Sequence, residues 1–264
     1  TLRNTGNRIG NRPRIIVHCR DPDFHNRGPG KLLRQWYIPR PHCAMPPTPS
    51  LPASKPAYWD EATRSLAKRD AVMARLVADY PGIHVVRRGD PFTTLARAIV
   101  GQQISVKAAQ TIWDRLVTAT RGGGIPIHLD PARVGRTRMT TLRRVGLSEN
   151  KALYIRDLAR HFVSGALDPR EWQALDDEDL ILRLTAVHGI GRWTAEMFLM
   201  FHELRPDVLP VADIGLQNAV AIHYYGGTRI PIAELRELAA MWSPWRSVAT
   251  WYLWRSLDPI PVEY

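Results

Sequence analysis

The feature that most constrains the fold is the spacing of the apolar residues, which from residue 57 onward recur at intervals of three and four. This spacing places them on one face of an α-helix. The longest stretch with the two-residue alternation of a strand is Ile83–Val86. We therefore predict an all-α protein of about eight to ten helices, separated by breaks rich in glycine and proline. The helical pattern covers Trp59–Tyr80, Phe92–Thr120, Lys151–Val163, Leu180–Val187, Arg192–Leu204, Ile214–Tyr225, Ile232–Met241 and Pro244–Leu257.

The first 56 residues lack this pattern and differ in composition. They hold ten of the 21 prolines, and residues 1–44 carry nine basic but only two acidic side chains. We interpret 1–56 as a basic, proline-rich, poorly ordered leader, and we expect native translation to start at or near Met45. The leader also holds histidines and cysteines that fit no familiar zinc spacing, and we interpret these as incidental: His18, Cys19, His25, His42 and Cys43.

Hydropathy and charge limit the class of function. No apolar run approaches the ~20 residues needed to cross a bilayer, and the N-terminus lacks a signal-peptide pattern. We therefore expect a cytoplasmic protein without membrane association, located at the nucleoid if it is bacterial. The net charge of +11 points to a polyanionic partner, with nucleic acid as the first candidate. This charge is a weak guide, because residues 45–264 carry 27 basic and 23 acidic side chains.

The sharpest motif is HGIG at residues 188–191, between two apolar helical segments. Glycines allow a tight turn with positive φ, and they let a nucleic-acid backbone approach without a Cβ in the way. The amides of such a turn, together with the N-terminus of the next helix, can bind a phosphate. A plain connection between two helices explains the same glycines, so the hairpin taken alone leaves both interpretations open.

Five segments of this chain, in order, resemble the helix-hairpin-helix DNA glycosylase superfamily, and in particular its 3-methyladenine DNA glycosylase II branch. The resemblance implies a helical core over 57–264. It also implies a DNA-binding cleft between two helical subdomains, one formed by 90–205 and the other by 57–89 plus 206–264. The five segments are AIVGQQIS (98–105), LRRVGLSENKA (142–152), GIGRWTA (189–195), LPVADIGL (209–216) and WSPWRS (242–247).

The resemblance assigns catalysis to Asp213, within LPVADIGL. A carboxylate beside a breaking N-glycosidic bond stabilises the oxocarbenium character of the sugar. It can also orient or deprotonate the attacking water. Asp213 directly precedes an apolar helical segment, where aspartate is a common N-cap and where the helix N-terminus stabilises its negative charge. Capping and catalysis are compatible, so position in the sequence does not separate them.

The resemblance also implies a pocket for a flipped base. Alkylation of a purine at N3 or N7 makes the base cationic, and an aromatic pocket then suits both stacking and cation–π attraction. The residues on the family's pocket positions are Trp193, Trp254, Met197 and Gln102. A methionine at position 197 differs from the tyrosine of the enterobacterial type of enzyme.

Further positions are implied to contact the duplex. Gln103 and Ile104 fall where the family fills the gap left by the flipped base, although ordinary packing also explains an isoleucine beside surface glutamines. The backbone carbonyls of 186–191 are where the family often holds a monovalent cation, which would be structural. The residues implied to hold phosphates are Gly189, Gly191 and Thr194.

The resemblance also distinguishes between the branches of the family. Bifunctional members such as endonuclease III carry a lysine where this chain has Trp193, and their four C-terminal cysteines hold an iron–sulfur cluster. An indole cannot form a Schiff base, and residues 45–264 contain no cysteine. We therefore predict a monofunctional glycosylase without cofactor or catalytic metal, acting as a monomer on damaged double-stranded DNA in base excision repair.

The predicted substrates are alkylated purines, with 3-methyladenine first. The same chemistry on 1,N6-ethenoadenine, hypoxanthine or uracil is the nearest alternative. A non-catalytic helix-hairpin-helix DNA-binding module is the alternative from a different class.

Overall fold

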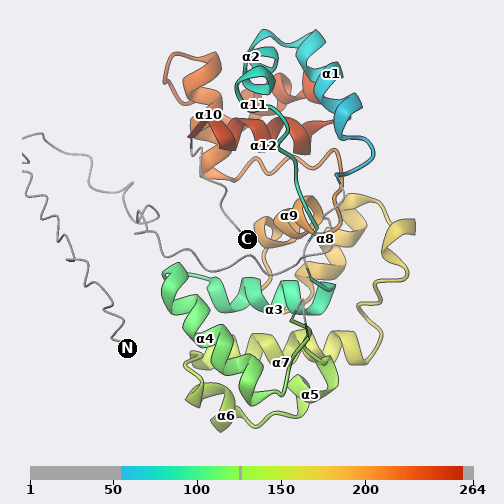
Figure 1. Ribbon diagram of the computed structural model, residues 1–264, viewed down its shortest axis with the longest axis vertical. Coiled ribbons are helices and arrows are strands. Elements are labelled where there is room, and N and C mark those ends of the chain that lie inside the picture. The colour runs from blue at the N-terminus through green and yellow to red at the C-terminus, as the bar shows by residue number, and fades with distance from the viewer. Residues whose placement is uncertain (1–54, 88, 125–126, 258–264) are drawn as a thin grey trace, which may run out of the picture. The chain divides into compact units, whose positions relative to one another are not determined.

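The computed structural model describes residues 55–87, 89–124 and 127–257, which all belong to the unit Met45–Tyr264. These residues are mostly helical and contain no β-strand, so the prediction of an all-α protein is confirmed (Figure 1). The predicted leader, with Met45 and the cysteines, lies outside the described residues apart from positions 55 and 56. The α-helices are α1 (Trp59–Arg69), α2 (Ala71–Asp79), α3 (Pro91–Gly101), α4 (Val106–Ala119), α5 (Pro131–Arg136), α6 (Met139–Arg144), α7 (Glu149–Val163), α8 (Asp177–Thr185), α9 (Arg192–Phe201), α10 (Ile214–Tyr224), α11 (Ile232–Ala239) and α12 (Arg246–Leu257), with 3-10 helices η1 (Trp172–Ala174) and η2 (Ala240–Trp242).

The described residues contain twelve α-helices, so the predicted number of eight to ten was wrong. Apolar spacing continues across breaks that the backbone nevertheless makes. Asp70 is extended (φ −141°, ψ 117°) and divides Trp59–Tyr80 into α1 and α2, and its carboxylate accepts a hydrogen bond from Val72 N at 2.8 Å. A four-residue loop, 102–105, likewise separates α3 from α4. Helices α5 and α6 have six residues each and are too short for a periodic signal.

Most of these helices begin at a short polar side chain that accepts a hydrogen bond from a first-turn N–H, an interaction worth ~1 kcal/mol. Helix α9 begins differently. Its N-cap is Gly191, which offers no side chain to the N–H groups of the first turn. The polar caps, in the order α2, α3, α4, α5, α7, α8 and α10, are Asp70, Asp90, Ser105, Asp130, Ser148, Asp176 and Asp213.

The buried side chains form two clusters. Core A draws on α3 to α9, and core B draws on α1, α2, α10, α11 and α12. Phe201, at the end of α9, and Trp254, in α12, pack against both cores. Figure 1 shows the helices of core B gathered around α12. Of the core A helices, α4, α5 and α6 lie beside α3 and α7, and α8 and α9 lie between them and core B. The subdomain boundaries predicted from the resemblance stay a prediction.

The start of α12 is set by a residue far away in the sequence. Arg246 N donates to Asp207 Oδ1 at 3.1 Å, and the Arg246 guanidinium donates to both oxygens of Asp207 at 2.8 Å. Ser243 Oγ donates to Asp207 Oδ2 at 2.9 Å. The helical pattern predicted a start at Pro244, but the helix begins two residues later, where Asp207 supplies an acceptor for the first N–H.

Candidate active site

Asp213 occupies the N-cap of α10. Its Oδ1 accepts a hydrogen bond from Leu216 N at 2.7 Å, which satisfies one of the unpaired N–H groups of the first turn. The helix N-terminus stabilises the negative charge of a carboxylate at this point. The capping role expected for Asp213 is therefore real, and it leaves Oδ2 available for other partners.

Two indoles complete the surroundings of this carboxylate. Trp254 Nε1 donates to Asp213 Oδ1 at 2.8 Å, and Trp193 Nε1 donates to Asp213 Oδ2 at 3.0 Å. The two tryptophans lie 20 and 41 residues away in sequence, on α9 and α12. An ionised carboxylate is only an acceptor, so it can take all three N–H donors at once. The structure thus brings together three of the predicted site residues and fixes the orientation of the carboxylate.

Gly215 also contributes to this arrangement, although its position in the sequence gives no sign of it. A Cβ added to Gly215 would lie 3.0 Å from Asp213 Oδ1 and 3.1 Å from Trp254 Nε1. These distances are shorter than ordinary contacts, so a side chain at position 215 would crowd the hydrogen bond between Trp254 and Asp213. The bond therefore requires glycine at this position. A glycine in the first turn of a helix carries no signal that would have identified this role.

Met197 and Phe201 follow Trp193 on α9 at intervals of four residues, which places all three on one face of the helix. Met197 is buried in core A at 8% exposure, whereas Trp193 is 43% exposed. The Phe201 ring stacks on Trp254, with ring centroids 5.8 Å apart and an interplanar angle of 17°. Phe201, absent from the predicted site, thus supports an indole that holds Asp213.

The loop 102–105 carries the residues predicted to enter the duplex. Gln103 is exposed and has a φ of +56°, while Ile104 is partly buried. Gln102 was predicted for the base pocket, but its Nε2 donates to the Gly189 carbonyl at 2.8 Å, so its side chain lies against the hairpin. Whether Gln102 also contacts a base stays a prediction.

The glycines of the hairpin serve different purposes. Gly189 has a φ of +85°, and an added Cβ would lie 2.2 Å from the Tyr154 ring. Gly191 has a φ of −86°, and an added Cβ would meet no protein atom within 4 Å. The expectation of positive φ therefore holds for Gly189 only, and Gly191 is the position that is open to an approaching backbone. Thr194, the third predicted phosphate contact, is partly buried in the first turn of α9.

Asp157 of α7 holds the hairpin at His188. Its Oδ2 accepts a hydrogen bond from His188 N at 2.9 Å and lies 2.8 Å from the ring Nδ1 of the same residue. Burial is the largest single effect and raises the pKa of Asp157, but the hydrogen bonds from His188 and the charges of His161 and Arg160 together lower this pKa below its usual value. An ionised Asp157 therefore anchors the turn.

Arg192, next to Gly191, joins the two helices of the hairpin. Its guanidinium pairs with Glu178 of α8 and donates from Nε to Glu196 Oε1 of α9 at 3.0 Å. Glu196 is 3% exposed, and this burial raises its pKa, although Arg192 acts in the opposite direction. The arginine of the GIGRW motif thus stabilises the hairpin from within.

The hairpin carbonyls bear on the predicted monovalent cation. The Val187 carbonyl accepts from Ile190 N at 3.1 Å, and the Gly189 carbonyl accepts from Gln102. Each of these carbonyl oxygens keeps a second lone pair that could bind a cation. The monovalent cation at 186–191 stays a prediction. Within the described part of the chain, no group of three His, Cys, Asp or Glu side chains could hold a metal ion.

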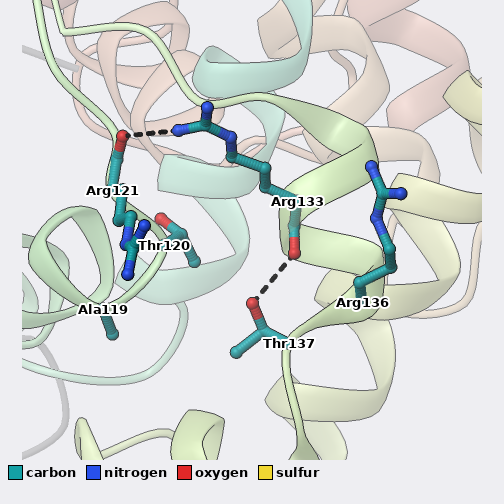
Figure 2. A pocket seen from close by; sticks show the side chains of 6 residues that line it. All are labelled: Ala119, Thr120, Arg121, Arg133, Arg136 and Thr137. Carbon is teal, nitrogen blue, oxygen red and sulfur yellow. Dashed lines mark hydrogen bonds between the residues drawn. The ribbon is translucent and has the colours of Figure 1, made fainter.

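A surface hollow of about 340 Å³ lies elsewhere, between the end of α4 and α5 (Figure 2). Arg133 Nη1 donates to the Arg121 carbonyl at 3.4 Å, and Thr137 Oγ1 donates to the Arg133 carbonyl at 2.9 Å. Figure 2 shows the Arg121 and Arg136 guanidinium groups on opposite sides of this hollow. None of the predicted site residues lines it.

Among the described residues, the helices are too short or too polar to span a membrane.

The helical fold, the hairpin and the carboxylate at the start of α10 define the class of protein. The chain belongs to the HhH-GPD superfamily base excision DNA repair proteins, which it matches over residues 96–245. It is 31% identical over 188 residues to DNA-3-methyladenine glycosylase 1 of Schizosaccharomyces pombe, a match that covers 70% of this chain and 80% of that protein. In two Bacillus subtilis relatives, 30% and 29% identical, the match covers 66% and 65% of their own length.

Two solved structures have a similar fold. The DNA-3-methyladenine glycosidase of Bacillus halodurans is 33% identical with a TM-score of 0.69, and the match covers 75% of this chain and 89% of that one. The S. pombe 3-methyladenine DNA glycosylase in complex with abasic DNA is 28% identical with a TM-score of 0.63, covering 76% of this chain and all of that one.

Proposed function

We propose that this protein is a monofunctional DNA glycosylase that hydrolyses the N-glycosidic bond of alkylated purines, with 3-methyladenine first. The observation that carries the proposal is the Asp213 carboxylate, held by Leu216 N and by the indoles of Trp193 and Trp254. The names of the relatives support the choice of substrate, since two of them are called 3-methyladenine glycosylases. We also propose that the protein acts as a monomer.

The carboxylate performs the central step. As the bond between sugar and base breaks, positive charge develops on the sugar, and Asp213 stabilises this charge electrostatically. The three N–H donors fix both carboxylate oxygens before the reaction, so little reorganisation is needed in the transition state. Asp213 also orients or deprotonates the water that attacks the sugar.

The tryptophans have a second role toward the base. A purine alkylated at N3 or N7 is cationic, and aromatic faces attract cations by about 0.5–2 kcal/mol per contact. Trp193 is 43% exposed and lies beside Asp213, so it can meet a flipped base at the reacting carboxylate. Trp193 has no amine that could form a Schiff base, which supports hydrolysis without lyase activity.

Double-stranded DNA is the proposed partner of the hairpin and of the loop 102–105. The first turn of α9 lacks a side-chain cap, so its N–H groups and positive helix end suit a phosphate. Gln103 is the exposed residue of this loop that would fill the gap left by the flipped base. These contacts place the duplex so that a flipped nucleotide reaches Asp213.

The test is incubation of the protein with methylated duplex DNA and chromatographic detection of released bases. The proposal predicts release of free 3-methyladenine and no covalent adduct after borohydride treatment. Duplexes that carry ethenoadenine, hypoxanthine or uracil serve as parallel substrates, and faster release from one of these would replace the alkylpurine assignment. Binding of DNA without release of any base would indicate a binding module, and a trapped adduct would contradict the monofunctional mechanism.

A further inference from the structure

The loop 102–105 is held from outside by a lysine of α7. Lys151 Nζ donates to the Val100 carbonyl at 2.9 Å and also to the Gln102 carbonyl. The last carbonyls of a helix lack partners within the helix and form its negative end, so an ammonium there satisfies both hydrogen bonding and charge. Lys151 is partly buried, and this burial lowers its pKa. Lys151 therefore joins α7 to the C-terminal end of α3 and to the first residue of the loop.

The same face of α7 supports the hairpin. Tyr154 lies three residues after Lys151, which places both side chains on one side of the helix. The Tyr154 ring fills the space that a side chain on Gly189 would need. Gln102 then joins loop and hairpin directly through its hydrogen bond to the Gly189 carbonyl. The duplex-entering loop and the phosphate-binding turn therefore share one support.

The conformation of the loop requires such a support. Gln103 has a φ of +56°, in the left-handed region that residues other than glycine rarely hold unless their surroundings enforce it. Gln102 precedes it and is fixed at two points: its carbonyl accepts from Lys151, and its side chain donates to the Gly189 carbonyl. On its C-terminal side, Ser105 Oγ caps α4 by accepting from Ala108 N at 3.3 Å.

We propose that Lys151 is a positioning residue for base flipping. It holds the loop 102–105 in a fixed position relative to the hairpin, so that Gln103 enters the duplex while the hairpin binds the DNA backbone. The inference rests on the proposed glycosylase function. Two of the three N–H donors of the Lys151 ammonium already bind carbonyls of the protein, and its side chain is partly buried, so we assign Lys151 to the loop and not to a DNA phosphate.

The test compares Lys151→Met with the parent in single-turnover release of N7-methylguanine from a duplex. The damaged base is paired with cytosine in one duplex and mispaired with thymine in another. Extrusion costs less from a mismatch, so a misplaced loop lowers the rate mainly on the matched duplex. On the matched duplex we expect the rate to fall about tenfold, which is the size of effect expected when a charged hydrogen-bonding group is removed. On the mismatched duplex the rate should fall clearly less. Arg156→Met, which removes an exposed charge from the same helix, serves as the matched control and leaves both rates unchanged.

A double variant with Gln103→Ala tests whether Lys151 acts through the loop. If it does, Lys151→Met adds little to the loss already caused by Gln103→Ala. Multiplying losses, or equal losses on matched and mismatched duplexes, would overturn the proposal. A phosphate contact would instead appear as weaker binding of undamaged duplex, with a salt dependence reduced by about one ion, and would also contradict it.

Gln102→Leu provides the same test if Lys151→Met fails to fold, since it removes the hydrogen bond between loop and hairpin at a partly buried position. The proposal predicts the same preference for the mismatch, and its absence would overturn it. Failure of the glycosylase function itself would be seen in the parent protein, which would then release no methylated base.

Discussion

Gly215→Ala should separate the stability of this protein from its activity. The new methyl group would lie 3.0 Å from Asp213 Oδ1 and 3.1 Å from Trp254 Nε1, on the hydrogen bond that joins them. One of the two groups must move by a few tenths of an ångström, because neither distance is an ordinary contact. The substitution therefore disturbs the carboxylate without removing any of its partners.

The expected change in stability is small, whereas the expected change in rate is large. Alanine is favoured over glycine within a helix by up to about 1 kcal/mol, which offsets the crowding in the folded state. A hydrogen bond to a charged group contributes about 1.5–3 kcal/mol, and a partial loss of about 1–2 kcal/mol of transition-state stabilisation corresponds to a decrease in kcat of about fivefold to thirtyfold. The midpoint of thermal unfolding should change little.

Single-turnover release of methylated base measures this effect, with thermal unfolding recorded on the same samples. Gly135→Ala is the matched control, since its new methyl would lie at an ordinary 3.5 Å from Ala159 Cβ in α7. That variant should retain the parental rate. A Gly215→Ala protein that releases base as fast as the parent would refute the claim that the orientation of Asp213 by Trp254 matters for the reaction.

Three further predictions concern the same machinery. Trp193→Phe removes a donor to Asp213 from an exposed ring, and single-turnover kinetics should show a loss of about threefold to tenfold with little change in thermal stability; an unchanged rate would contradict the role of this indole. Gly189→Ala should lower the free energy of urea unfolding by at least about 2 kcal/mol, because positive φ and the adjacent ring both resist a methyl group; a change below about 0.5 kcal/mol would be inconsistent with this turn. Asp157→Asn should destabilise the protein at pH 7, where the lowered pKa keeps the parental carboxylate ionised, and this difference should shrink as the pH falls below about 4, through the folded pKa of Asp157; urea unfolding at pH 7, 5, 4 and 3 tests this, and a constant difference would argue against the ionised anchor at His188.

Part of the fold was predictable because it depends on local signals. Apolar spacing and polar caps such as Ser148 mark helices within a few residues of their observed ends. The start of α12 was not predictable in this way, because the acceptor for Arg246 N comes from Asp207, 39 residues earlier. The short α5 and α6 were missed because six residues are too few to show a period.

The candidate site divides along a similar line. Asp213, Trp193 and Trp254 were identified by resemblance, and the structure adds that both indoles donate to the carboxylate. The roles of Gly215 and Lys151 could not be identified, because they depend on distances between elements. A glycine in a helix and a lysine on an amphipathic helix look ordinary until the groups beside them are known.

The most direct test of the central claim is the single-turnover rate of 3-methyladenine release by Asp213→Asn, compared with the parent protein. Asparagine keeps an oxygen that can cap α10, so the fold should be retained, but it carries no charge to stabilise the developing cation on the sugar. We predict a loss of at least about a hundredfold, corresponding to about 2.7 kcal/mol or more of transition-state stabilisation. Release at the parental rate by a folded Asp213→Asn protein would contradict the account.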